Sequence, residues 1–212
     1  MSNRHRIREL LKHPQIWQSG RSPARHPKTL PTGFAELDQA LSGGWPVGVL
    51  IELLIDSCGT GEFRLLMPAL TALSRNATTQ LQWVMLIAPP YIPYAPALVR
   101  QGVDISRFQV VHCHRRAEVF WATEQALYSG TCSAVLAWTG VSDVSDERAL
   151  RRLQLAAEQG QSWLVLFRPA RFRRQRSPST LRIDCQSAPP HGLRVDIFKN
   201  RGSRPRAVII PG

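Results

Sequence analysis

Residues 50–64, LIELLIDSCGTGEFR, have the order of a phosphate-binding loop: an apolar strand, a glycine-bearing turn and the start of a helix. A working loop reads GxxxxGK[ST], because glycines let backbone N–H groups approach the phosphates, the lysine contacts their oxygens and the hydroxyl binds Mg²⁺. Here Gly59 and Gly61 are followed by Glu62 and Phe63. A carboxylate repels a triphosphate, and phenylalanine offers no metal ligand. The motif therefore predicts a degenerate nucleotide site.

Three longer stretches resemble the core of RecA-like recombinases. Residues 32–48 resemble the start of that core, residues 84–111 the stretch with the catalytic glutamate, and residues 129–140 the Walker B strand. Under this resemblance Pro90 replaces the glutamate and Trp138 replaces the aspartate that holds magnesium. Proline cannot act as a general base, and an indole does not bind Mg²⁺. With the lysine also missing, we expect no enzyme activity and no cofactor, which excludes a recombinase or motor ATPase.

The same residues also have ordinary structural explanations. Pro90 suits the end of a strand, Trp138 suits a strand interior, and Glu62 suits the start of a helix. These explanations are compatible with a lost nucleotide site, because a site that no longer binds ATP can be refilled with structural residues. No GxSxG motif or paired carboxylates point to another enzyme class.

Several further segments of the sequence resemble one RecA-derived family: GGWPVG, ELLIDSCGTGEFRLLMPAL, APPYIPYAPAL, AEVFWATEQALYSG and RALRRLQLAAEQGQSWLVLFRP. From about Gly20 to the C-terminus, the chain resembles the ImuA proteins of bacterial translesion DNA synthesis. The resemblance implies a non-catalytic RecA-like adaptor of damage-induced (SOS) mutagenic synthesis. The implied partners are an ImuB-type Y-family-like protein and a second replicative-type polymerase subunit. The resemblance is also compatible with binding of RecA, with binding of DNA through basic loops, and with self-association.

The related SulA cell-division inhibitors supply an alternative. They share the GxGE-type start of the helix after the glycine turn, and the strand order. This alternative implies inhibition of the tubulin-like cell-division protein. SulA proteins typically lack so long an N-terminal lead and the basic final hairpin, which favours the ImuA-like interpretation.

The formal net charge of +12 is concentrated at the two ends of the chain. Residues 1–28 hold seven Lys or Arg against one acid, residues 29–167 nine against twelve, and residues 168–212 eleven against two. Basic ends of this kind are typical of segments that contact nucleic acid or an acidic protein, although solvated charge runs are commoner. The candidate contacts to DNA or an acidic partner are Arg171, Arg173, Arg174, Arg176, Lys199, Arg201, Arg204 and Arg206.

Residues 1–28 are expected to be a basic arm and linker that precede one domain, residues 29–212. Within the arm, Ile16 and Trp17 form an isolated apolar pair of the kind that anchors a partner, or that packs on its own domain. No apolar run of about eighteen residues occurs, so we expect a cytoplasmic protein, nucleoid-associated when engaged.

The cysteines and histidines do not predict a metal site. Cys58, Cys132 and Cys185 are scattered, without a CxxC pair, which favours free thiols. The run 112–114, His-Cys-His, places two histidines on one face of a strand but lacks a third ligand nearby.

Alternating apolar runs and amphipathic stretches predict the elements that position these residues. The expected fold is α/β: a RecA-like, mostly parallel sheet with helices on both faces and short antiparallel strands at its C-terminal edge. Core strands are expected at 49–55, 81–88, 108–113, 133–138 and 163–167. Helices are expected at 62–74, 93–101, 117–128 and 146–159. After these come basic loops at 168–180 and 199–206, and antiparallel strands at 181–185, 193–198 and 207–210.

Overall fold

The computed structural model describes residues 28–59, 61–75, 82–140, 147–188, 190, 192–201 and 203–211. The strands are β1 (Thr29–Leu30), β2 (Trp45–Pro46), β3 (Leu50–Ile55), β4 (Trp83–Ile87), β5 (Phe108–Val111), β6 (Cys132–Trp138), β7 (Trp163–Pro169), β8 (Leu181–Ala188), β9 (Gly192–Asn200) and β10 (Arg206–Ile210). The helices are α2 (Ala35–Ala40), α3 (Glu62–Arg75), α4 (Ala95–Arg100), α5 (Arg116–Tyr128), α6 (Glu147–Gly160) and the short 3-10 helices η1 (Ile105–Arg107) and η2 (Ala170–Arg174).

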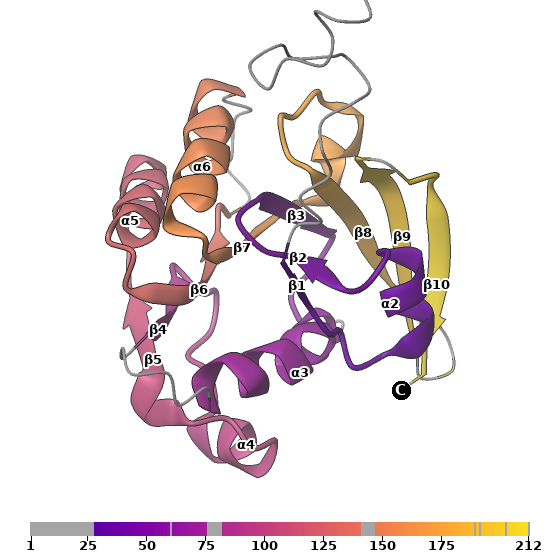
Figure 1. The fold of residues 1–212 in the computed structure, drawn as a ribbon, viewed down its shortest axis with the longest axis horizontal. Helices are drawn as coiled ribbons and strands as arrows, with labels where there is room; N and C mark the ends of the chain where they lie inside the picture. The colour runs from indigo at the N-terminus through magenta and orange to yellow at the C-terminus, as the bar shows by residue number, and fades with distance from the viewer. Residues whose placement is uncertain are drawn as a thin grey trace, which may run out of the picture.

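An eight-stranded sheet forms the centre of the described chain (Figure 1). Its strand order is β10-β9-β8-β3-β7-β6-β4-β5. The six strands from β8 to β5 run parallel to one another, and β9 and β10 are antiparallel to their neighbours. The first two strands, β1 and β2, form a separate antiparallel pair.

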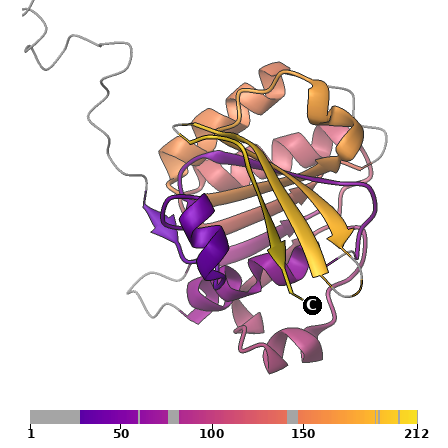
Figure 2. The same cartoon turned by 90° about the vertical axis from the view of Figure 1, so that its right-hand side faces the viewer.

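Helices cover both faces of this sheet, with α3 on one side and α5 and α6 on the other (Figures 1 and 2). Successive side chains of β3 point to opposite faces of the sheet, which explains the two hydrophobic layers. Ile51 packs in the layer that contains α3, whereas Leu50 packs in the layer that contains α5 and α6. In α6, Leu150, Leu153 and Ala157 are buried at helical spacing, so one stripe of that helix packs on the sheet.

The expectation of a RecA-like, mostly parallel sheet with only short antiparallel strands is wrong. The sheet is mixed, and its antiparallel section contains the longest strands of the described chain, β8 with eight residues and β9 with nine. Only a few residues join β8 to β9 and β9 to β10. A parallel return needs a crossover of about a dozen residues or more, so these short connections force antiparallel pairing.

The elements predicted between 49 and 167 are all present, although their ends differ by a few residues. The structure adds α2, β1 and β2, which are too short to produce a readable periodicity. It also adds η2 within the basic segment 168–180, which was predicted to be a loop. The proposed anchor residues Ile16 and Trp17 lie outside the described residues. Among the helices described, none has both the length and the apolar character needed to cross a membrane.

Candidate functional site

The glycine turn after β3 binds a carboxylate of its own chain. Gly59 and Gly61 have φ angles of +90° and +102°, which favour glycine. The N–H of Gly59 donates to Oε1 of Glu62 at 2.8 Å, and Glu62 is buried at the start of α3. In a phosphate-binding loop such an N–H faces the ligand. Here the side chain of Glu62 satisfies it, and the carboxylate also suits the positive end of the helix dipole.

A cavity of about 560 Å³, here called the carboxyl-edge cavity, opens where the parallel strands β3, β4, β6 and β7 end. Pro90 and Trp138 both line it, although they are far apart in the sequence. The indole of Trp138 stacks on Phe167 with ring centroids 4.4 Å apart and planes 2° from parallel. The carboxyl ends of parallel strands are the usual ligand-binding edge of α/β sheets. The structure therefore brings two of the predicted site residues into one place.

The remaining predicted residues of the nucleotide site are not part of this cavity. Gly59 and Glu62 do not line it, and Gly61 instead lines a smaller cavity of about 270 Å³ beside Arg64 and Gly192. The cavity thus reaches the start of the turn after β3, at Asp56, Ser57 and Cys58, but not its two glycines, which sequence spacing alone did not predict.

The two thiols of the carboxyl-edge cavity are not activated nucleophiles. Cys58 and Cys113 line it, and burial raises the pKa of both thiols, with Glu62 and Glu118 adding to the increase. Both thiols therefore stay protonated at neutral pH, whereas a nucleophilic cysteine needs a lowered pKa. Among the described residues, no three His, Cys, Asp or Glu side chains gather as metal ligands do.

The segment 88–94, here called the aromatic loop, exposes large apolar side chains beside the carboxyl-edge cavity. Tyr91 is 72% exposed and lines the cavity, while Ile92 and Tyr94 are 81% and 68% exposed. Pro90 and Pro93 fix their own φ angles, which reduces the conformational freedom that the loop loses on binding. A loop with exposed aromatic and aliphatic side chains is typical of a protein-binding hot spot.

The eight basic residues predicted to contact DNA or an acidic partner have different environments. Arg173 is already paired within the chain, because its guanidinium bonds Asp184 at 2.8 Å and Asp196 at 2.7 Å, although its side chain is 38% exposed. Arg171 lies over the ring of Phe172. Arg171 is exposed, as are Arg174, Arg204 and Arg206, and none of these four lines a described cavity.

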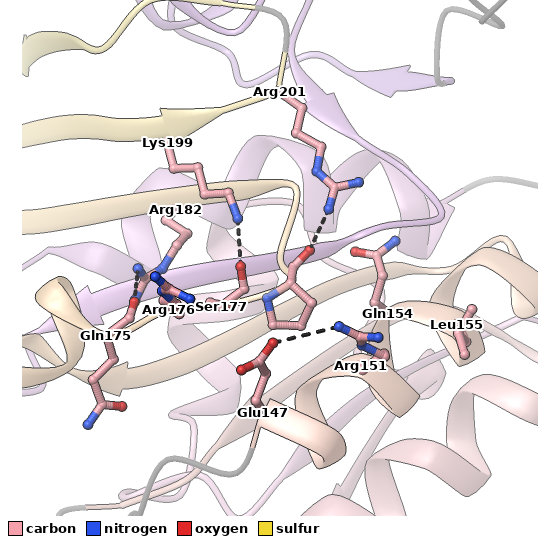
Figure 3. A pocket seen from close by; sticks show the side chains of 11 residues that line it. Glu147, Arg151, Gln154, Leu155, Gln175, Arg176, Ser177, Arg182, Lys199 and Arg201 are labelled. Carbon is pink, nitrogen blue, oxygen red and sulfur yellow. Dashed lines mark hydrogen bonds and ion pairs between the residues drawn. The ribbon is translucent and has the colours of Figure 1, made fainter. Parts of the chain in front are cut away.

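Arg176, Lys199 and Arg201 share a second cavity of about 570 Å³, here called the basic pocket (Figure 3). Its other wall is α6, which contributes Glu147, Arg151 and Leu155. Sequence reasoning missed the α6 residues. Their spacing of four places them on one face of the helix, and this was the signal available in the sequence.

A buried polar cluster supports the floor of the basic pocket. Glu52 is fully buried, and its carboxylate accepts hydrogen bonds from Arg168 at 2.9 Å and from the hydroxyl of Ser177. Arg182 lies 3.4 Å from the same carboxylate and donates to the carbonyl of Gln175 at 2.8 Å. These bonds fix the connection between β7 and β8, from which Ser177 and its neighbours line the pocket.

Electrostatics keeps that buried carboxylate ionised. Burial by itself would raise the pKa of Glu52, because it penalises the charged form. The guanidinium groups of Arg182 and Arg168, together with the hydroxyl of Ser177, outweigh this effect and lower the pKa below its ordinary value. The cluster is therefore a set of paired charges rather than a protonated acid available for catalysis.

Two curated proteins are similar to this chain, and both are described as cell division inhibitor SulA. They come from Pectobacterium carotovorum and Pectobacterium atrosepticum, and each is 26% identical over 122 residues, which covers 58% of this chain and 69% of the relative. The similarity is to cell-division inhibitors. The crystal structure of SulA from Pseudomonas aeruginosa matches with a TM-score of 0.44 and 28% identity, covering 56% of this chain and 97% of that chain. No protein-family model matches.

The two curated relatives support the SulA-like alternative of the resemblance. The similarity to SulA is weak but extends over more than half of the chain. The narrower assignment to ImuA, with its polymerase-like partners, has no support from these relatives.

Proposed function

We propose that this chain is a cytoplasmic, non-catalytic inhibitor of cell division that acts by binding the tubulin-like division protein, as the SulA name of its relatives suggests. The observation that carries the proposal is the aromatic loop at the rim of the carboxyl-edge cavity, with Tyr91, Ile92 and Tyr94 exposed. The relatives' description as cell division inhibitors supplies the process, and the SulA-like alternative drawn from the sequence supplies the partner. Inhibition then requires only occupation of a surface that the division protein needs for polymerisation.

The geometry of the glycine turn and the cavity supports a binding role over an enzymatic one. The carboxylate of Glu62 already occupies the N–H of Gly59, where a phosphate would be bound. Trp138 and Pro90 line the carboxyl-edge cavity in place of groups that activate water or hold a metal. The exposed apolar side chains of the aromatic loop remain at the rim, and they are suited to a protein partner.

The test is polymerisation of the purified tubulin-like division protein, followed by light scattering and sedimentation in the presence of this chain. We expect the wild-type chain to lower the amount of polymer. Replacing Tyr91 and Ile92 by alanine should weaken inhibition by on the order of tenfold, because exposed aromatic anchors carry most of the binding energy of such interfaces. The matched control is Trp121→Ala, since Trp121 is 63% exposed on α5 but does not line the cavity. No inhibition by the wild-type chain would exclude the proposal.

A second candidate is a non-catalytic adaptor of damage-induced translesion DNA synthesis that binds an ImuB-type protein. The observation in its favour is that the similarity to SulA covers 58% of the chain, so the rest has no counterpart in those alignments. Both candidates are compatible with an SOS context. Co-purification with an ImuB-type protein, without effect on the division protein, would favour the adaptor.

A further inference from the structure

The basic pocket concentrates positive charge in a concave site. Arg151 comes from α6, Arg176 from the connection before β8, and Lys199 and Arg201 from the end of β9 and the turn after it (Figure 3). The carboxylate among the lining residues, Glu147, lies 3.6 Å from Arg151, and the two side chains are 55% and 69% exposed. Solvent screens such an exposed pair, so it is weak. The pocket therefore retains an excess of positive charge.

Two of these cations are held in place by backbone carbonyls of the connection before β8. Nζ of Lys199 donates to the carbonyl of Ser177 at 2.7 Å, and Nη2 of Arg201 donates to the carbonyl of Pro178 at 3.1 Å. Burial lowers the pKa of Lys199, and the nearby charges of Arg201 and Arg182 lower it further. Like charges are thus positioned close together before any ligand arrives, and an anion would relieve their repulsion.

The pocket also offers an apolar contact. Leu155 is 55% exposed on α6 and lines the pocket together with Pro178. The lining residues include no aromatic ring on which a nucleobase would stack. A ligand with carboxylates and one apolar side chain matches this combination better than a nucleic acid does. The chain's own residues 1–28 have the wrong charge to fill it, with seven Lys or Arg against one acid.

We propose that the basic pocket binds a short acidic peptide segment of a partner protein. Its carboxylates pair with Arg151, Arg176, Lys199 and Arg201, and an apolar side chain packs on Leu155. A volume of about 570 Å³ suits a few peptide residues. The basic pocket shares no lining residue with the carboxyl-edge cavity, so this binding is separate from the proposed inhibition of division and goes beyond it.

Fluorescence polarisation of a labelled peptide, EEDLDEE, with the full chain tests the proposal. We expect saturable binding that weakens between about 50 and about 200 mM salt, because ions screen the pairing charges. The uncharged peptide QQNLNQQ should not bind. The double variant Arg151→Glu with Arg176→Glu should weaken binding by on the order of tenfold or more. Leu155→Ser should weaken binding of EEDLDEE but not of EEDSDEE, which lacks the apolar side chain.

The matched control is Arg174→Glu with Arg204→Glu, which changes net charge equally at exposed sites outside the pocket. It should bind the acidic peptide within a few-fold of wild type, and circular dichroism should show every variant folded. Equal losses in the control would overturn the proposal, because binding would then follow net charge. Tighter binding of a single-stranded oligonucleotide, weakened by the pocket variant, would overturn it in favour of a nucleic-acid site. Absence of peptide binding at low salt would also overturn it.

Discussion

Glu52 and Arg168 lie on adjacent parallel strands and form an ion pair of 2.9 Å in which neither side chain reaches solvent, with exposed fractions of 0% and 1%. The pair sits beneath the connection from β7 to β8, and Arg182 and Ser177 complete the bonding of the carboxylate. Removing charges from water is costly, so each member of this cluster depends on the others. The connection that lines the basic pocket is thereby tied to the centre of the sheet.

Replacing Glu52 by alanine should lower the free energy of unfolding by roughly 3–5 kcal/mol, because Arg168 and Arg182 would then be buried without their counter-charge. Urea denaturation followed by circular dichroism measures the effect. The control Glu147→Ala also removes one carboxylate, but from an exposed pair with Arg151. It should change stability by less than about 1 kcal/mol. Similar losses in both variants would contradict the structural role assigned to the buried cluster.

Stability should fall in acid partly through Glu118, at the start of α5. Its carboxylate accepts hydrogen bonds from the side chain and backbone of Arg115 and from the backbone of His114, which lower its pKa from 4.5 to about 2. A lowered pKa contributes stability that is present above the unfolded value and is lost as pH falls through the folded value. Between pH 4.5 and 2, the Glu118→Gln variant should therefore lose less stability than wild type. Thermal melts of both proteins across this range measure the effect. If the melting temperatures of the variant and wild type fell in parallel with pH, Glu118 would not be the group responsible.

The stacked pair of Trp138 and Phe167 should contribute substantially to stability. Trp138→Ala removes a buried ring and is expected to cost roughly 3–5 kcal/mol. Trp138→Phe keeps an aromatic ring against Phe167 and should cost less, about 1–2 kcal/mol, since the volume change is smaller. Chemical denaturation of both variants gives the comparison. Equal losses would contradict this prediction, because the ring kept in Trp138→Phe would then recover none of the stability lost in Trp138→Ala.

We expect no binding of ATP with Mg²⁺ in isothermal titration calorimetry. The N–H of Gly59 is already bonded to the carboxylate of Glu62. Glu62→Lys should not recover ATP turnover in a phosphate-release assay, because Pro90 and Trp138 still lack the oxygen ligands and the base that phosphoryl transfer needs. A saturable heat with the wild-type chain would show that the glycine turn still accepts phosphate.

Much of the secondary structure was predictable from local pattern. β3, β6 and β7 are apolar runs because they are covered on both faces, and the helical spacing of Leu150, Leu153 and Ala157 marks the buried stripe of α6. The sequence also showed that Glu62, Pro90 and Trp138 stand where the resemblance expects nucleotide-binding and catalytic residues. Counting from motifs did not predict that only Pro90 and Trp138 share a cavity.

The sequence by itself determined that the C-terminal part of the chain is strongly basic, but only the tertiary structure decided what each charge does. Arg173 and Arg176 are three residues apart and look equivalent in the sequence. Arg173 is neutralised because the pairing of β8 with β9 places Asp184 beside Asp196 under its guanidinium. Arg176 instead faces a cavity completed by Arg151 from α6. Strand register and helix packing bring distant residues together through non-local contacts, which no local pattern in the sequence records.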